Sequence, residues 1–127
     1  MGKNINRDYI IELLLQLPQY NKKFEIVPSA KPLQFYKHDR NQTIYILVTG
    51  WKEGLTLKMA IKSSSTKQVL EYYPVFEGVE GDTHIFKVAL SNEILANPSK
   101  YEFQFFIINN GTITSSNIDN FRVKDCL

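Results

Sequence analysis

The sequence is poor in the residues on which disulfide bonds, metal sites and many active sites depend. Its 127 residues include one cysteine, two histidines and one tryptophan. The single cysteine, Cys126, excludes an intrachain disulfide, so we expect the protein to work in a reducing compartment such as the cytoplasm. No apolar run is long enough to cross a membrane, and the N-terminus carries no signal-peptide pattern.

The charge is also low. The formal net charge is +2, and basic and acidic residues are interspersed. We therefore expect neither a nucleic acid nor a membrane surface as a partner. The hydrophobic content of 43% is ordinary for a globular protein, and the length suits a single domain over residues 1–127.

Catalytic and metal-ligand patterns are absent. Neither His38 nor His84 has a second histidine or a cysteine at ligand spacing, so the sequence predicts no metal site. Cys126 has no sequence context that would activate a nucleophile. The segment GVEG, residues 78–81, is expected to be a turn rather than a phosphate loop, because no helix pattern follows it. We expect a protein without a cofactor that is not an enzyme.

Residues 6–17, NRDYIIELLLQL, are expected to form an amphipathic helix. Asn6 can cap its start, and Pro18 would stop it. The apolar residues follow the helical spacing i, i+3, i+4, i+7, at Ile10, Leu13, Leu14 and Leu17. Such a helix either packs beside the core or binds a partner.

From residue 23 onward the apolar pattern changes to that of short strands. The spacing of 8–12 residues predicts an antiparallel, immunoglobulin-like β-sandwich of about seven or eight strands over residues 23–123. Asn109-Asn110-Gly111 is a strong hairpin signal. The candidate strands are 23–27, 33–37, 43–49, 55–62, 67–74, 84–90, 101–108, 112–114 and 121–123.

Strict alternation in three of these strands predicts the core. The residues expected to face inward are Leu55, Leu57, Met59, Ile61, Phe86, Val88, Leu90, Tyr101, Phe103, Phe105 and Ile107. Phe106 and Ile108 point away from this core, so another element should cover them. We expect the N-terminal helix to do so.

Trp51 lies outside this alternation, between Gly50 and Lys52. A flat, exposed ring can stack on the apolar face of a sugar, while amides and lysines bind the hydroxyl groups. Asn117, Asp119 and Asn120 could supply such groups from the last hairpin. Two alternatives stay open: Trp51 packs at the edge of the core, and the asparagines serve turn geometry.

Three segments carry a resemblance to a known family: TGWKEGLTLKMAIK, DTHIFKVAL and YEFQFFIINNGTITSSNIDNFRV. Together they resemble family-21-like starch- and glycogen-binding modules, as in glycogen-targeting subunits of type-1 protein phosphatase. The resemblance spans residues 43–123. The family's aromatic before an Asp-Asn-Asn run is replaced here by Thr114 or Ser115. Tyr72 or Tyr73 could supply that ring instead.

The resemblance implies a non-catalytic module that binds glycogen or a related α-1,4-glucan. It would target a protein effector to glycogen, such as a phosphatase, a glycogen enzyme or a degradation adaptor. The site residues would be Trp51, Lys52, Asn117, Asp119 and Asn120. The alternative is a β-sandwich protein-interaction module that has lost sugar binding, which the replaced aromatic favours.

Overall fold

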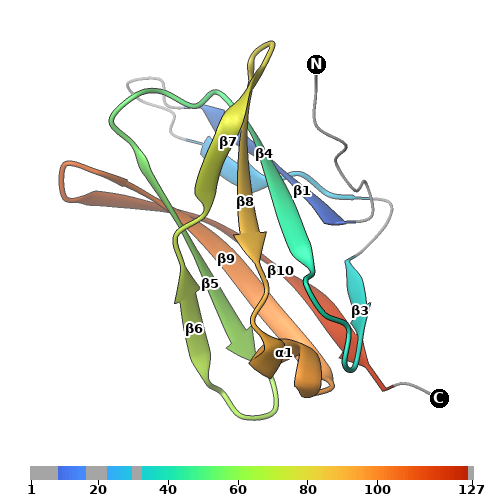
Figure 1. Ribbon diagram of the computed structural model, residues 1–127. Helices are drawn as coiled ribbons and strands as arrows, with labels where there is room; N and C mark the ends of the chain where they lie inside the picture. The colour runs from blue at the N-terminus through green and yellow to red at the C-terminus, as the bar shows by residue number, and fades with distance from the viewer. Residues whose placement is uncertain (1–8, 17–22, 30–32, 126–127) are drawn as a thin grey trace.

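The computed structural model describes residues 9–16, 23–29 and 33–125 (Figure 1). These residues form two five-stranded sheets and one short helix. Sheet A has the strand order β2-β1-β4-β8-β7, and sheet B has the order β3-β10-β9-β5-β6. The elements are β1 (Ile10–Gln16), β2 (Lys23–Ile26), β3 (Gln34–Tyr36), β4 (Thr43–Thr49), β5 (Thr56–Ser63), β6 (Val69–Tyr72), β7 (Val75–Glu80), β8 (Thr83–Ala89), α1 (Asn92–Ala96), β9 (Ser99–Asn109) and β10 (Thr112–Lys124).

Buried apolar side chains from both sheets form one core, so the two sheets make a β-sandwich. Phe35, Phe105 and Phe121 are the largest of its fully buried side chains. Along β9, residues alternate between buried and partly or fully exposed, as the period of two in the sequence predicts. The all-β class expected from the sequence is therefore confirmed.

The expected N-terminal helix is wrong for the described part of that segment, because Ile10–Gln16 forms the strand β1. The rest of the expected helix lies outside the described residues. Ile11, Leu13 and Leu15 are buried in the core, and the residues between them are less buried. An apolar run of this length satisfies both the helical and the strand period, so the local pattern alone does not decide between them.

Two distant strands decide the conformation of β1. It lies between β2 and β4, antiparallel to the first and parallel to the second. The backbone N–H and C=O groups on both edges of β1 therefore find partners in neighbouring strands, whereas in a helix they would bond within the same segment. On the outer face of sheet A, Ile10 lies opposite Tyr45, and both are half-buried.

The sandwich is mixed rather than purely antiparallel. Besides β1 and β4, β3 and β10 also pair in parallel. Because β2 and β4 belong to sheet A and β3 to sheet B, the chain crosses from one sheet to the other and back between them. Such crossings bring strands that are not adjacent in sequence together in a parallel direction.

The strands β10 and β7 also differ from expectation. The two short closing strands are one long strand, β10, interrupted by a bulge between Ser115 and Ile118. The expected turn at residues 78–81 belongs mostly to β7, which the sequence did not reveal. A register shift between Phe76 and Gly78 interrupts its alternation and explains why no period of two is visible there.

A pair of alanine variants distinguishes the strand β1 from a helix. Leu13 is 1% exposed, so Leu13→Ala should lower the free energy of unfolding by about 3 kcal/mol. Leu14 is on the outer face and half-buried, so Leu14→Ala should cost about 1 kcal/mol. Urea unfolding measures both. Equal, large losses would place both leucines in the core, as a helix does, and would contradict β1.

Candidate binding surfaces

Trp51 follows β4, where Gly50 turns the chain. Gly50 has a φ of +93°, and a Cβ at this position would lie 1.9 Å from the carbonyl oxygen of Leu15 in β1. Only glycine tolerates this approach. The indole packs edge-on against Phe86, with ring centroids 4.9 Å apart and an interplanar angle of 64°. Trp51 is thus half-buried against the core, whereas Lys52 beside it is exposed.

Asn117 lies in the bulge of β10 and has a structural partner. Its side-chain oxygen accepts a hydrogen bond of 2.7 Å from the Ile26 N–H, which connects β10 of sheet B to the edge strand β2 of sheet A. The neighbouring Ser116 is buried; its hydroxyl accepts from the Phe105 N–H at 2.9 Å and donates to the Asn117 carbonyl at 2.7 Å. These bonds satisfy the backbone where the ladder is interrupted.

Asp119 and Asn120 follow the bulge on opposite sides of β10. The Asp119 carboxylate accepts a hydrogen bond of 2.8 Å from the Asn120 N–H. The Asn120 side chain is exposed and lies opposite Glu102, on the outer face of sheet B.

The structure does not bring Trp51 and the β10 residues to one site. Trp51 packs on β8, while Asn117 bonds to β2. In sheet A these two strands are separated by β1 and β4, which is three strand spacings or about 14 Å. Lys52 remains beside Trp51, so the five predicted residues divide into two groups.

One aromatic residue that the sequence did not indicate, Phe76, extends the surroundings of Trp51. The Phe76 ring contacts Phe86 at a centroid distance of 5.5 Å and His84 at 5.8 Å. Phe76 is 52% exposed, and the Nδ1 atom of His84 is buried with no hydrogen-bond partner among the described residues. Phe76 was not predicted because it lies in the unrecognised strand β7.

The two histidines lie apart from one another in the fold. His84 is on β8, whereas His38 is in the turn after β3, where its N–H donates to the Leu95 carbonyl at 3.0 Å. Among the described residues, no group of three or more His, Cys, Asp or Glu side chains could hold a metal ion. Cys126 is outside the described residues.

A second surface is the outer face of sheet B. Its apolar part, which we call the β9–β10 patch, consists of Phe106, Ile108, Ile113 and Ile118. Ile113 and Ile118 are 63% and 58% exposed, and Phe106 and Ile108 are half-buried. Cross-strand pairing places Ile113 opposite Ile108. Ile118 lies opposite Gln104 and Phe106 lies opposite Ser115, so the patch extends over both strands with polar residues between its members.

Lys58 borders this patch from β5. Its ammonium group lies 2.6 Å from the Glu71 carboxylate and 5.4 Å from the centre of the Phe106 ring. The hydrogen bond to Glu71 raises the pKa of Lys58, while partial desolvation opposes that rise. Lys58 thus stays charged and covers one side of Phe106.

The β9–β10 patch is open because the element expected to cover it is elsewhere. The sequence predicts that an N-terminal helix would shield Phe106 and Ile108. The described part of that segment is instead β1, in the middle of sheet A. No described element lies over the outer face of sheet B, where Ile113 remains largely exposed.

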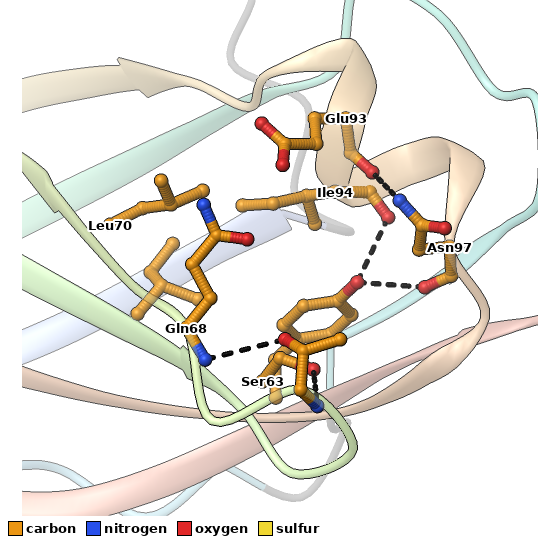
Figure 2. A pocket seen from close by; sticks show the side chains of 9 residues that line it. Ser63, Gln68, Leu70, Glu93, Ile94 and Asn97 are labelled. Carbon is orange, nitrogen blue, oxygen red and sulfur yellow. Dashed lines mark hydrogen bonds between the residues drawn. The ribbon is translucent and has the colours of Figure 1, made fainter.

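A small pocket lies at the end of the sandwich beside α1, as Figure 2 shows. Its volume is about 150 Å³. Ser91 caps α1 by accepting from the Ile94 N–H at 3.4 Å. The Tyr101 hydroxyl donates to the Asn97 carbonyl at 2.7 Å, which fixes the end of α1 to β9. The lining residues are Ile61, Ser63, Thr66, Gln68, Leu70, Glu93, Ile94, Asn97 and Tyr101.

Comparison with known proteins assigns no family. No family model matches the chain, and no curated protein matches it. Among similar solved structures is the N-terminal domain of phage TP901-1 ORF48, with 18% sequence identity over 91% of this chain and 97% of that one. The TM-score is 0.43, so this similarity indicates no function. Among the described residues, no helix is long and apolar enough to span a membrane.

Alanine substitutions at two glycines test how β1 positions Trp51. Gly50 and Gly54 both have positive φ, but a Cβ at Gly54 would meet nothing within 4 Å. Backbone strain alone costs about 1–3 kcal/mol at either site. Gly50→Ala adds a clash with backbone, so it should destabilise by about 2 kcal/mol more than Gly54→Ala in urea unfolding. Similar losses for the two variants would refute the close contact with Leu15.

Proposed function

We propose that this chain is a non-catalytic β-sandwich that binds a protein partner through the outer face of sheet B. The observation that carries the proposal is the β9–β10 patch. Two isoleucines, Ile113 and Ile118, each expose more than half of their surface on one open sheet face. Exposed apolar surface of this kind is typical of interaction sites.

The charges on the outer face of sheet B favour an acidic partner: Lys58 borders the patch, whereas Lys100 and Arg122 lie toward the other end of β9 and β10. The alternation and pairing of the strands place more basic than acidic side chains on this face. The basic residues are Lys58, Lys62, Lys100, Arg122 and Lys124, and the acidic residues are Glu71 and Glu102. A partner that fits would present an apolar centre with an acidic rim. Opposite potentials accelerate association and exclude competing partners, while the apolar centre supplies most of the affinity.

The sandwich itself supports this use of the face. The patch residues are on β9 and β10, two long strands that pair with one another; β3 pairs with β10 only at residues 122–124, so Ile113 and Ile118 lie where β10 pairs with β9 alone. A rigid surface loses little conformational entropy on binding. The single cysteine is consistent with the same proposal in a reducing compartment such as the cytoplasm.

Binding of an α-glucan is a second candidate function, at Trp51 and Lys52. The observation that favours it is the row of rings from Trp51 through Phe86 to Phe76, because Phe76 is 52% exposed and could act as the second aromatic. In this proposal the hydroxyl groups of the sugar would be bound by Lys52 and by groups near the rings. Asn117 would take no part, since it bonds to β2.

A serine double variant tests the protein-interaction proposal. The wild-type chain captures partners from an extract of its source cells, and each captured protein is then purified and titrated by calorimetry. Ile113→Ser with Ile118→Ser should weaken binding at least tenfold, or about 1.4 kcal/mol, because the apolar centre is lost. Raising the salt concentration should weaken it further.

The matched control for this test is Val79→Ser. Val79 is 52% exposed, comparable to Ile118, but lies on β7 of sheet A. Val79→Ser should bind like the wild type. The free energy of unfolding of every variant should lie within about 0.5 kcal/mol of the wild-type value, because the changed residues are exposed. Failure to capture any partner, or equal affinity of the double variant, would end the proposal.

Affinity electrophoresis in glycogen gels tests the second candidate. Glycogen should retard the wild-type chain, and Trp51→Ala should abolish the retardation, because a stacked aromatic commonly contributes about 2 kcal/mol or more. Phe76→Ser removes an exposed ring without emptying the core, so it separates loss of binding from loss of folding. Unchanged mobility of the wild type in glycogen would exclude this function.

A further inference from the structure

We propose that the pocket beside α1 binds an alkylammonium group, such as the side chain of a lysine in another polypeptide or a small free amine. This site is independent of the β9–β10 patch. Its elements are the end of β5, the following turn, the start of β6, α1 and the start of β9.

The walls of the pocket suit an aliphatic stem. Ile61 and Ile94 are buried, and Leu70 is half-buried, so together they form an apolar wall. The volume of about 150 Å³ is below the 300–1,000 Å³ typical of sites for drug-sized ligands. An engineered cavity of about this size holds a benzene molecule, which has six carbon atoms. The pocket therefore has room for a group of about the size of one side chain.

The mouth of the pocket suits a cation. Figure 2 shows the Glu93 carboxylate and the Gln68 amide pointing toward the same space, one from α1 and the other from the segment leading into β6. Ser63 and Thr66 add hydroxyl groups from the turn. An ammonium group donates up to three hydrogen bonds and needs acceptors of this kind.

Two of these acceptors, the Glu93 carboxylate and the Gln68 side-chain oxygen, are unoccupied by other residues of the described chain, whereas the Ser63 and Thr66 hydroxyls accept from the N–H groups of Thr66 and Gln68. No described lysine or arginine pairs with the Glu93 carboxylate, and no described donor bonds to the Gln68 side-chain oxygen. The backbone carbonyl of Glu93 accepts from the Asn97 amide at 2.7 Å, which fixes the residue without using its carboxylate. The pocket therefore presents an uncompensated negative charge above an apolar wall.

The effect of this charge reaches the interior of the pocket. Burial raises the pKa of the Tyr101 hydroxyl, and the negative charge of Glu93 raises it further. The Tyr101 proton is already donated to main-chain carbonyls of Ile94 and Asn97. Glu93 and Tyr101 both line the pocket, so an entering cation would lie near both side chains.

Chemical-shift titration of the ¹⁵N-labelled chain at neutral pH tests the site with n-butylamine. Amide signals of residues 63–68 and 93–97 should shift, with a Kd on the order of 1–10 mM, as expected for a ligand of so few atoms. The same titration with n-butanol, which has the stem without the charge, should give shifts at least about fivefold weaker at equal concentration. Nα-acetyl-lysine methylamide distinguishes the sources: tighter binding than butylamine assigns the site to a lysine in a chain, and weaker binding assigns it to a free amine.

Two variants complete the test. Glu93→Gln keeps the shape and removes the charge, so it should raise the Kd for butylamine at least about fivefold. Glu80→Gln makes the same charge change at the end of β7, where Glu80 pairs with Thr83 and is separated from α1 by the whole length of β8. It should bind like the wild type. Equal shifts with butanol, no shifts with butylamine, or an unchanged Kd in Glu93→Gln would each overturn the proposal.

Discussion

The hydrogen bond from the Ile26 N–H to the side chain of Asn117 connects the two sheets where β10 is interrupted. Apolar contacts between sheets are not directional, so they hold the layers together without fixing their lateral position. A polar bond of 2.7 Å across the layers does fix it. Ser116 makes this geometry possible, because its hydroxyl bonds to the Phe105 N–H that the bulge would leave unsatisfied. This connection fixes the edge strand β2 of sheet A against the bulge of β10 in sheet B.

Strands with strict local alternation could be predicted from the sequence, and segments defined by distant partners could not. β4 and β9 carry a clear period of two, and their inward residues are buried as expected. β1 has apolar residues on both of its faces, so its pairing with β2 and β4 decides that it is a strand. β7 has a bulge at its centre, which removes the alternation that would have revealed it.

The candidate surfaces, too, could be predicted only in part from the sequence. The sequence indicates that Trp51 is unusual, and that Phe106 and Ile108 face away from the core. It does not reveal that β1 comes within reach of Gly50, since that contact joins residues distant in the chain. One wrong assignment affects a second one: the helix expected to cover Phe106 does not form over residues 10–16, so none of the described elements covers the outer face of sheet B.

Asn117 is predicted from the sequence to bind a sugar, but its side chain already holds β2. This decides which surface can bind a ligand without disturbing the fold. A sugar that took the place of Ile26 at the Asn117 oxygen would leave a main-chain N–H without a partner, at a cost of about 1–3 kcal/mol. That cost is comparable to the contribution of one good stacking contact. The β9–β10 patch carries no such penalty, because Ile113 and Ile118 are exposed and hold nothing else in place. A ligand that contacts Ile113 and Ile118 therefore displaces no hydrogen bond of theirs, whereas a ligand that engages the Asn117 oxygen must compete with the bond that connects the sheets.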